Sequence, residues 1–353
     1  IPHKNNATIS EMRIMSMNID GDSDLDKILA ETKKRDVHVM IGVDAERSTN
    51  NYTTWDEIKN NFSHDAKVGI FCGVKQLWGR ALGGTIAAVG KGWNQRCTSI
   101  DGDCRKWGRY TVVKIKGKTS RNLWIIALYA PYNNKAAPQS YHNLLVDCMQ
   151  NYERVHSTRL QRDAEGNLCP HIQLRTDLDR ILAKASTAGA EVIITGDFNE
   201  KWSERGPYRQ WMEQNGLVNL LTPDSITGGS TTCFPRGGDP SDIDWALCTH
   251  SLYNAGAVRA GVLHEKIGIS AHCPIFISVK TKLWLQLSDG DVTNCKKHNY
   301  EANHIKGGPK DKRVINYQKL ISKFWKKNDC SKLTVTALEK AEIHYNNRAK
   351  GGV

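Results

Sequence analysis

Short apolar runs alternate with amphipathic stretches over the first 282 residues, and this alternation predicts a layered α/β domain. Three stretches have helical periodicity, at 22–35, 138–153 and 173–187. The apolar runs are predicted as strands, and they cover 12–19, 37–43, 84–90, 110–117, 123–131, 191–199, 243–249 and 274–279. Several of these strands end in a polar residue, and active sites of layered folds collect their side chains at such ends.

Composition narrows the class of protein. With 39% hydrophobic and 24% charged residues among 353, the chain can bury an ordinary core, which excludes a wholly disordered or collagen-like protein. No apolar run approaches the roughly 20 residues that a membrane-spanning helix needs, so no membrane association is expected. The ten Cys residues include no CxxC pair, which gives a structural zinc site little support. Without a recognisable signal peptide, we expect reduced thiols and an intracellular protein.

The positive charge is unevenly distributed. The formal net charge is +12, and residues 283–353 contain 14 Lys or Arg against 7 Asp or Glu, whereas the first 282 contain 35 against 30. Gly307, Gly308 and Pro309 precede a basic, partly helical stretch. We therefore predict one domain at 1–282 and a basic helical extension at 283–353. The extension is interpreted either as a solvated connector or as a nucleic-acid-binding arm.

The segment IITGDFNE (193–200) is the strongest chemical signal. A β-branched strand delivers Asp197 and Asn199 two residues apart, on the same side of an extended chain, and Gly196 permits the close approach of a substrate. A carboxylate and a carboxamide in one pocket can orient and deprotonate a water. The alternative for GDFN alone is a turn closed by an Asx hydrogen bond.

Two further polar residues stand directly before apolar strands. Asp244 precedes Trp245 in SDIDWAL, and His272 precedes the run that begins at Pro274 in SAHCPI. An Asp near a His fixes the tautomer of the ring and raises its pKa, which gives an imidazolium able to stabilise a pentacovalent phosphorane. A lone His at a strand end more often has a structural role. Because Asp244 and the GDFN motif accompany His272, we favour a catalytic role for it.

The ordered set of motifs resembles the endonuclease/exonuclease/phosphatase superfamily, which includes apurinic-type endonucleases and DNase I-like enzymes. Each motif alone is weak, but the order is specific, and the resemblance covers roughly residues 11–280. It implies a four-layer α/β sandwich of two mixed sheets packed face to face, and Mg²⁺-dependent cleavage of phosphoester bonds, with Mn²⁺ as a substitute. The matching segments are SMNIDG (16–21), GVDAE (42–46), GGTIAAV (83–89), ALYAPYN (127–133), GDFNE (196–200), SDIDWAL (241–247) and SAHCPI (270–275).

The resemblance also implies roles for single residues. Asn18 would lie in the metal and phosphate pocket, and Tyr129 would hydrogen-bond a phosphate oxygen or the leaving group. Asp197 would orient and deprotonate the attacking water with Asn199 beside it. His272 would stabilise the transition state, with Asp244 behind it.

The chain departs from the family at two positions. A Glu usually ends the second strand as the principal metal ligand, whereas VMIGVDAER offers Asp44 or Glu46, and the position of Asp44 nearer the strand end favours it slightly. Ala271 replaces the Asp of the family's Ser-Asp-His pattern, which predicts weaker metal binding or slower turnover. Three explanations of Ala271 compete: an engineered inactivating substitution, a naturally degenerate enzyme, and a variant that works without the Asp. The survival of the other motifs favours the first.

Two segments mix aromatic and basic residues, at 71–82 and 91–110. They are interpreted as DNA-contacting loops, with contacts from Trp78, Arg80, Arg105 and Arg109, or as a hairpin with core Trp residues and a charged rim. The second interpretation is at least as well supported by the sequence. The polar region 154–172 is interpreted as an insertion near the substrate.

The branch of the superfamily is inferred from charge and from the extension. A basic protein suits a polyanionic substrate such as DNA. The extension resembles the segment that joins the endonuclease to the reverse transcriptase in non-LTR retroelement polyproteins, which would explain the start without Met and the final Gly-Gly. We therefore predict a nuclear endonuclease that nicks target DNA to leave a 3′-hydroxyl, with a reverse transcriptase fused at its C-terminal side. The alternatives are a catalytically inactive DNA-binding module, an apurinic repair endonuclease, and a phosphoesterase that acts on another substrate.

Overall fold

The computed structural model describes residues 11–21, 25–46, 52–75, 81–118, 121–132, 136–137, 139–221, 231–264 and 270–287. These residues belong to one compact unit, Ile1–Lys296. Trp78, Arg80, the first residues of the predicted helix at 22–35 and nearly all of the basic extension lie outside the described residues. Trp284, Leu285 and Leu287 are buried against the core, so the folded region runs at least to Leu287.

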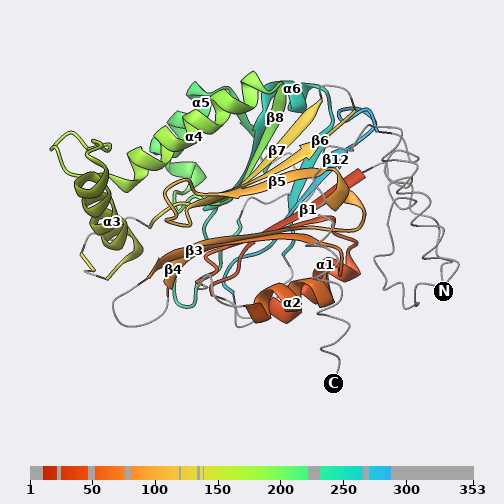
Figure 1. The fold of residues 1–353 in the computed structure, drawn as a ribbon, viewed down its shortest axis with the longest axis horizontal. Helices are drawn as coiled ribbons and strands as arrows, with labels where there is room; N and C mark the ends of the chain where they lie inside the picture. Colours follow the sequence, from red (N-terminus) through yellow and green to blue (C-terminus); the bar gives the residue numbers. More distant parts are fainter. Residues whose placement is uncertain are drawn as a thin grey trace, which may run out of the picture. The chain divides into compact units, whose positions relative to one another are not determined.

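Two mixed sheets form the centre of the molecule (Figure 1). The first sheet has the order β11 (Val258–Val262), β12 (Ile275–Lys280), β1 (Glu11–Asn18), β2 (Val39–Val43), β4 (Ala81–Val89) and β3 (Lys67–Lys75). The second has the order β5 (Cys97–Gly102), β6 (Tyr110–Lys116), β7 (Asn122–Tyr129), β8 (Ala190–Asp197), β10 (Asp244–Thr249) and β9 (Leu217–Asn219). Each sheet contains one parallel pair, β1 with β2 and β7 with β8.

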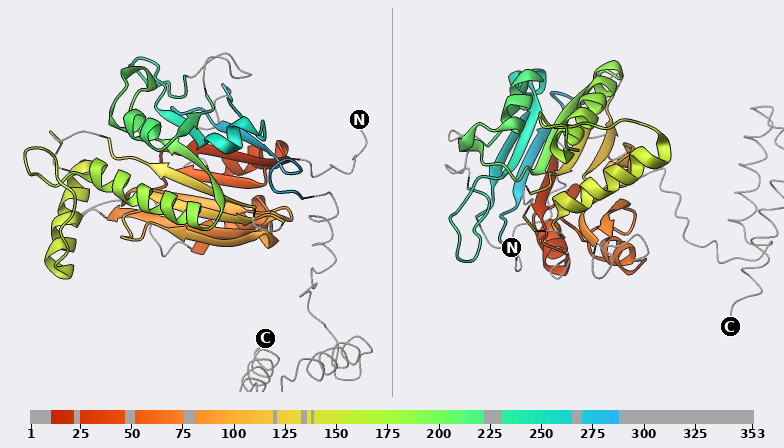
Figure 2. Two further views of the ribbon diagram at one scale, coloured as in Figure 1. Left: turned by 90° about the horizontal axis from the view of Figure 1, so that it is seen from above. Right: turned by 90° about the vertical axis from the view of Figure 1, so that its left-hand side faces the viewer.

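Helices cover the outer faces of both sheets (Figure 2). The described α-helices are α1 (Leu25–Lys34), α2 (Tyr52–Asn61), α3 (Tyr141–His156), α4 (Pro170–Thr187), α5 (Pro207–Gln214) and α6 (His250–Asn254), and the buried apolar residues of α3 and α6 join the core between the sheets. Helices α1 and α2 bury their apolar faces on the first sheet, and α4 and α5 bury theirs on the second. None of the described helices is both long and apolar enough to cross a bilayer.

The distribution of buried apolar side chains explains why the fold has four layers. Strands in the middle of each sheet carry apolar side chains on both faces, so one set fills the space between the sheets and the other meets the helices. In β1, for example, Met12 and Ile14 face the second sheet, whereas Met15 and Met17 pack against α1. The predicted four-layer α/β sandwich is confirmed.

The register of the second sheet aligns three of the predicted site residues. Tyr129 at the end of β7 is paired with Asp197 at the end of β8, and Asp197 is paired across the next ladder with Asp244 at the start of β10. Asn18 and Val43 end the parallel pair of the first sheet together. The polar strand ends therefore meet at one edge of the sandwich.

Candidate active site

Asp197 is held from both sides at the end of β8. The Asn18 Nδ2 donates to its Oδ2 over 2.9 Å, and the backbone N–H of Asn199 donates to its Oδ1 over 2.8 Å. The carboxylate is 2% exposed. Burial, together with repulsion from Asp244, raises the pKa of Asp197 to about 7, against the attraction of His272. A carboxylate with this pKa can accept a proton near neutral pH.

Asn199 lies beside Asp197 because the chain turns there, not because the two residues alternate along a strand. It follows the end of β8 in a left-handed conformation, with φ 49°, and its Nδ2 donates to the carbonyl of Ala130 over 2.8 Å. The Asx hydrogen bond that the turn alternative expected is present between the Asn199 backbone and Asp197. Asn199 therefore closes a turn that fixes Asp197, and the expectation that both side chains share one face of a strand is wrong.

Gly196 permits a close approach, but the approach is between two strands of the sheet and not between the protein and a substrate. Its φ is 141°, and a Cβ at this position would lie 2.1 Å from the carbonyl oxygen of Leu128 in the neighbouring strand. The glycine therefore allows β7 and β8 to pack together rather than making room for a substrate.

His272 and Asp244 form the predicted pair. The His272 Nδ1 lies 2.7 Å from Asp244 Oδ2, and both side chains are largely buried. Burial opposes the charged imidazole, but the carboxylate of Asp244 outweighs that effect and raises the pKa of His272 to about 12. His272 is therefore an imidazolium at neutral pH, with its Nε2 3.6 Å from the Sγ of Cys233.

Ser270 joins His272 to the first sheet. Its Oγ donates to the carbonyl of Asn18 over 2.8 Å and accepts the backbone N–H of His272 at 3.1 Å. Ala271 stands between them, with its carbonyl accepting the backbone N–H of Phe234 over 2.8 Å. The backbone of the altered motif is thus anchored at both neighbours of Ala271, and the substitution removes a carboxylate without removing these bonds.

Asp44 and Tyr129 form a second pair in the same place. The Tyr129 hydroxyl is hydrogen-bonded to the Asp44 carboxylate. Burial raises the pKa of Asp44 to about 6; the bond from Tyr129 offsets part of the rise, and the charge of Asp20 adds to it. Burial also raises the pKa of Tyr129 well above its usual value, so the phenol remains protonated. The charge of His272 acts on Asp44 as well, which places the two pairs in one electrostatic site.

Tyr129 is supported by a second tyrosine. The ring of Tyr141, the first residue of α3, stacks on Tyr129 with centroids 5.3 Å apart, and its hydroxyl donates to the carbonyl of Trp107 over 2.9 Å. A Cβ on Gly83 would lie 2.6 Å from the Tyr141 ring, and the backbone of Gly83 is hydrogen-bonded to Asp44. Tyr141 therefore packs against Tyr129 and against Gly83, which bonds Asp44, and no sequence pattern predicted this role.

The oxygen-rich side of the site fits a hard divalent cation. Asp44 and Asp20 are close enough to raise the pKa of Asp44, and within the described parts of the chain no Lys or Arg pairs with either. Glu46 lies nearby, with its Oε2 3.2 Å from a Cβ built on Gly21. Carboxylate oxygens are the ligands that Mg²⁺ prefers. Asp20 was missed by sequence reasoning, although it follows Asn18 by two residues in the same motif.

Asn18 lies in the predicted pocket but with its amide engaged. Its Oδ1 accepts the backbone N–H of Asp20 over 2.9 Å while its Nδ2 donates to Asp197. Asn18 therefore positions Asp197 and the turn that carries Asp20. The group Asp197, Asp244 and His272 also brings three ligand atoms within 4.8 Å of one another, but the bond between His272 and Asp244 occupies two of them.

Arg105 and Arg109, the two predicted DNA-contacting arginines among the described residues, have structural roles. Arg109 is fully buried, and its guanidinium bonds Asp103 over 2.7 and 3.0 Å and Asp177 over 2.7 Å. Arg105, with 7% of its side chain exposed, bonds Asp177 over 3.2 and 3.4 Å. A guanidinium without exposed atoms cannot reach a phosphate, so the prediction for Arg109 is wrong. The prediction for Arg105 is wrong as well, because its charge is already paired.

The segments that carry these arginines follow the hairpin interpretation. Strands β3 and β4 form a hairpin, and β5 pairs with β6. Trp93 and Trp107 are both buried in the core between the sheets. These tryptophans are therefore core residues, as the second interpretation expected.

The described fold is similar to that of several solved structures. An AP endonuclease from Leishmania major has a TM-score of 0.55 at 12% identity, over 77% of this chain and 88% of that one. An endonuclease/exonuclease/phosphatase family protein from Leptotrichia buccalis has 0.52 at 10% identity, over 76% and 99%. The catalytic domain of Xenopus laevis APE2 has 0.51 at 15% identity, over 76% and 92%. Neither a family model nor a curated protein sequence matches. The chain therefore has the fold of the endonuclease/exonuclease/phosphatase superfamily, as its motifs predicted.

Proposed function

We propose that this chain is a metal-dependent phosphodiesterase that nicks one strand of DNA and leaves a 3′-hydroxyl. The observation that carries the proposal is the meeting of a buried carboxylate of raised pKa, Asp197, with an imidazolium, His272, at one edge of the sandwich. One group can accept a proton near pH 7 while the other holds a fixed positive charge, which is the pairing that hydrolysis of a phosphodiester needs.

The residues divide the work as follows. Asp197 accepts a proton from water as the water oxygen bonds to phosphorus and the bond from phosphorus to the 3′ oxygen breaks, and the departing 3′ oxygen takes up a proton from solvent. Asn18 and Asn199 hold the two oxygens of Asp197 so that the lone pairs left over face the water. His272 hydrogen-bonds a non-bridging oxygen, where negative charge develops. Tyr129 remains a hydroxyl donor to a phosphate oxygen or to the leaving group.

Magnesium would be held by Asp44 together with Asp20 or Glu46. Their carboxylates offer the hard oxygen ligands that Mg²⁺ takes, and Mn²⁺ accepts the same donors. When bound, the ion supplies positive charge for the phosphate and its leaving oxygen. The position of Asp44 beside Tyr129 supports it as the principal ligand.

A DNA substrate is supported by the net charge of +12 and by the basic extension, because phosphate contacts dominate binding to DNA. The same extension supports a place in a retroelement polyprotein, before a reverse transcriptase and in the nucleus. The Leishmania major and Xenopus laevis neighbours are described as an AP endonuclease and as APE2, and an abasic-site substrate is the alternative they suggest.

Ala271 favours a second candidate, a DNA-binding module that has lost cleavage. The family pattern has an Asp here, next to His272, and its absence removes a negative charge from the site. All the hydrogen bonds around Ala271 are made by its backbone and its neighbours, so restoring the carboxylate should not disturb the fold.

Supercoiled plasmid with Mg²⁺ or Mn²⁺ tests both candidates. The chain, its Ala271→Asp variant and the double variant with His272→Ala are compared, and nicks are scored for a 3′-hydroxyl by extension with a DNA polymerase. We expect Ala271→Asp to nick and His272→Ala to abolish that activity. DNA binding without nicking in all three proteins would instead favour the binding module, and nicks that a polymerase cannot extend would contradict the proposed bond cleavage.

A further inference from the structure

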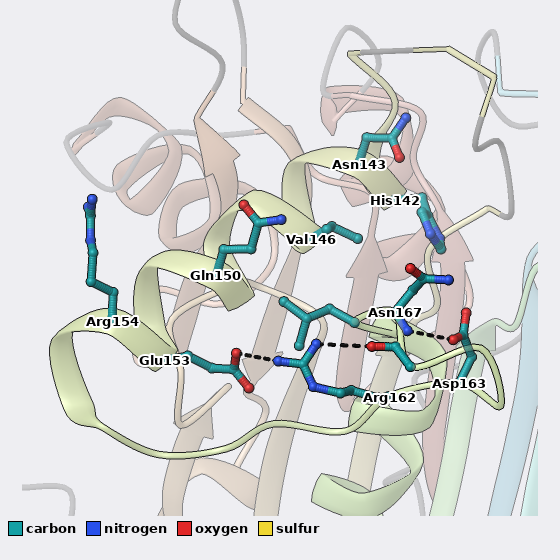
Figure 3. A pocket seen from close by; sticks show the side chains of 11 residues that line it. His142, Asn143, Val146, Gln150, Glu153, Arg154, Arg162, Asp163 and Asn167 are labelled. Atoms are coloured by element: carbon teal, nitrogen blue, oxygen red, sulfur yellow. Dashed lines mark hydrogen bonds and ion pairs between the residues drawn. The ribbon is translucent and has the colours of Figure 1, made fainter.

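A groove runs along α3 and the segment that follows it (Figure 3). Its larger part has a volume of about 770 Å³ and lies between α3 and residues 162–168. A smaller part of about 310 Å³ is lined by residues 157–159. Glu153 and Arg162 line both parts, so the two are continuous. None of the residues that line the groove belongs to the site described above.

The groove begins beside that site. Tyr141, which stacks on Tyr129, is the first residue of α3, and His142, the next residue, lines the larger part of the groove. Arg154, in the last turn of α3, lines the same part. The rise of a helix places these two lining residues about 18 Å apart. Since duplex DNA rises ~3.4 Å per base pair, the groove spans the length of about five base pairs away from the reacting phosphate.

The charges of the groove are arranged for a partner that is both anionic and polar. Arg162 Nη2 lies 2.7 Å from Glu153 Oε2, so these two charges cancel at the centre. Arg159 is exposed and, among the described residues, has no hydrogen bond or ion pair. It lies with Ser157 and Thr158 in the smaller part, where the Thr158 hydroxyl already donates to the carbonyl of His156 over 3.1 Å and the Ser157 hydroxyl is exposed. An arginine and hydroxyls at an open surface are common contacts of DNA phosphates.

The larger part has a different lining. Figure 3 shows side chains from α3 and from the following segment facing one another across it. The side-chain amides of Gln150 and Asn167 and the apolar side chains of Val146 and Leu168 are among them. Amides can pair with the edges of bases, and apolar atoms can pack against their faces. The lining therefore suits an uncharged polar ring next to a phosphate.

We propose that this groove holds a nucleotide of the substrate strand several positions away from the scissile bond, with its phosphate in the smaller part near Arg159 and its base in the larger part near Asn167. The proposal rests on the proposed action on DNA and adds to it a second contact region outside the reacting centre. Its effect is on substrate binding, because the groove contains no group that reaches the reacting atoms.

Binding of a fluorescein-labelled DNA duplex, followed by anisotropy in EDTA over a series of salt concentrations, tests the proposal without cleavage. Arg159→Gln should weaken binding roughly tenfold at low salt and reduce the slope of log K against log salt by about 1, as expected for one lost phosphate contact. Asn167→Ala should weaken binding by a similar factor at every salt concentration, because a base contact releases no counterions. The backbone N–H of Asn167, which donates to Asp163, is kept in this variant.

Arg259→Gln is the matched control. Arg259 is exposed on β11, outside the groove, and its loss changes the net charge by the same amount. We expect its salt slope to equal that of the unchanged chain. If Arg159→Gln also keeps that slope while the unchanged chain binds DNA, the groove proposal is wrong and the proposed function stands. If the unchanged chain does not bind DNA, both the groove proposal and the proposed function are wrong.

Discussion

The charge of His272 is the feature whose consequences can be measured most directly. Asp244→Asn removes the negative charge behind the ring and keeps nearly the same shape. The bond between His272 Nδ1 and Asp244 Oδ2 is 2.7 Å long, and the Asp244 side chain is only 4% exposed. Water therefore screens this interaction poorly, and its loss should be large.

The magnitude follows from the opposing effects on the ring. Burial alone disfavours the imidazolium, whereas Asp244 raises the pKa of His272 to about 12. Without Asp244, burial opposes the remaining attraction of Asp197, and we expect the pKa to fall to the neighbourhood of its ordinary value, about 6.5. At pH 7.5 the ring would then be protonated in about one molecule in ten, compared with nearly all molecules before the change.

Nuclear magnetic resonance of the histidine ring measures this without requiring cleavage. The His272 Cε1–H signal, assigned by its loss in His272→Ala, should not move between pH 5 and 9 in the unchanged chain and should titrate within that range in Asp244→Asn. Because the folded pKa is raised, the pair contributes stability that is fully present below about pH 6.5 and is lost as pH rises towards 12. The free energies of unfolding of the two proteins should therefore converge as pH rises above 6.5.

Asp242→Asn provides the control, because Asp242 is a neighbouring carboxylate that accepts the backbone N–H of Trp202 over 3.2 Å rather than contacting the ring. It should leave the His272 signal unchanged. A titration of His272 near pH 6.5 in the unchanged chain, or an Asp244→Asn signal that does not move, would refute the reasoning.

Two further predictions concern stability. Arg109→Leu should lower the free energy of unfolding in urea at pH 7 by about 3–5 kcal/mol, because it leaves the buried carboxylate of Asp103 without its partner. Arg180→Leu should lower it by less than about 1 kcal/mol, because the Arg180 side chain is 60% exposed. Equal losses in the two variants would contradict the structural role of Arg109. Burial raises the pKa of Asp197 to about 7, so this group lowers stability increasingly as pH rises from its unfolded value of about 3.9 through 7. Asp197→Asn should therefore unfold at a higher temperature than the unchanged chain at pH 8 and at a similar temperature at pH 4, with cleavage lost; a lower melting temperature at pH 8 would count against this reading.

The sequence predicted the inner strands well because their signal is local. Runs such as EVIITGDFN are β-branched and long, and the strand Ala190–Asp197 lies within one residue of the predicted start. Four described strands, β3, β5, β9 and β11, were missed, and two of them show why: Lys67–Lys75 contains two glycines, and Leu217–Asn219 has three residues. Helix α5 was missed because its start depends on a group outside the helix, the carboxylate of Glu200, which accepts the backbone N–H groups of two residues in its first turn.

The site was predicted where chemistry follows directly from a strand end, as for Asp197, Asp244 and His272. It was not predicted where the partner lies far along the chain. Arg109 looked like a DNA contact because Asp177, 68 residues later, has no visible connection to it in the sequence. Asp20 was not predicted because it follows the end of β1 in a left-handed conformation, with φ 44°, where strand alternation no longer applies.

The alignment of Tyr129, Asp197 and Asp244 across three adjacent strands separates the chemistry of this fold from its loops. Backbone hydrogen bonds between the strands fix the spacing of the three side chains, and Tyr141 supports Tyr129, so the chain between Tyr141 and α4 can be lengthened, shortened or replaced without moving them. An insertion such as α3 and the segment after it can therefore change which molecule is bound while the reacting groups stay in place. In a scaffold of this kind, new specificity can be acquired by exchanging loops, without redesign of the catalytic row.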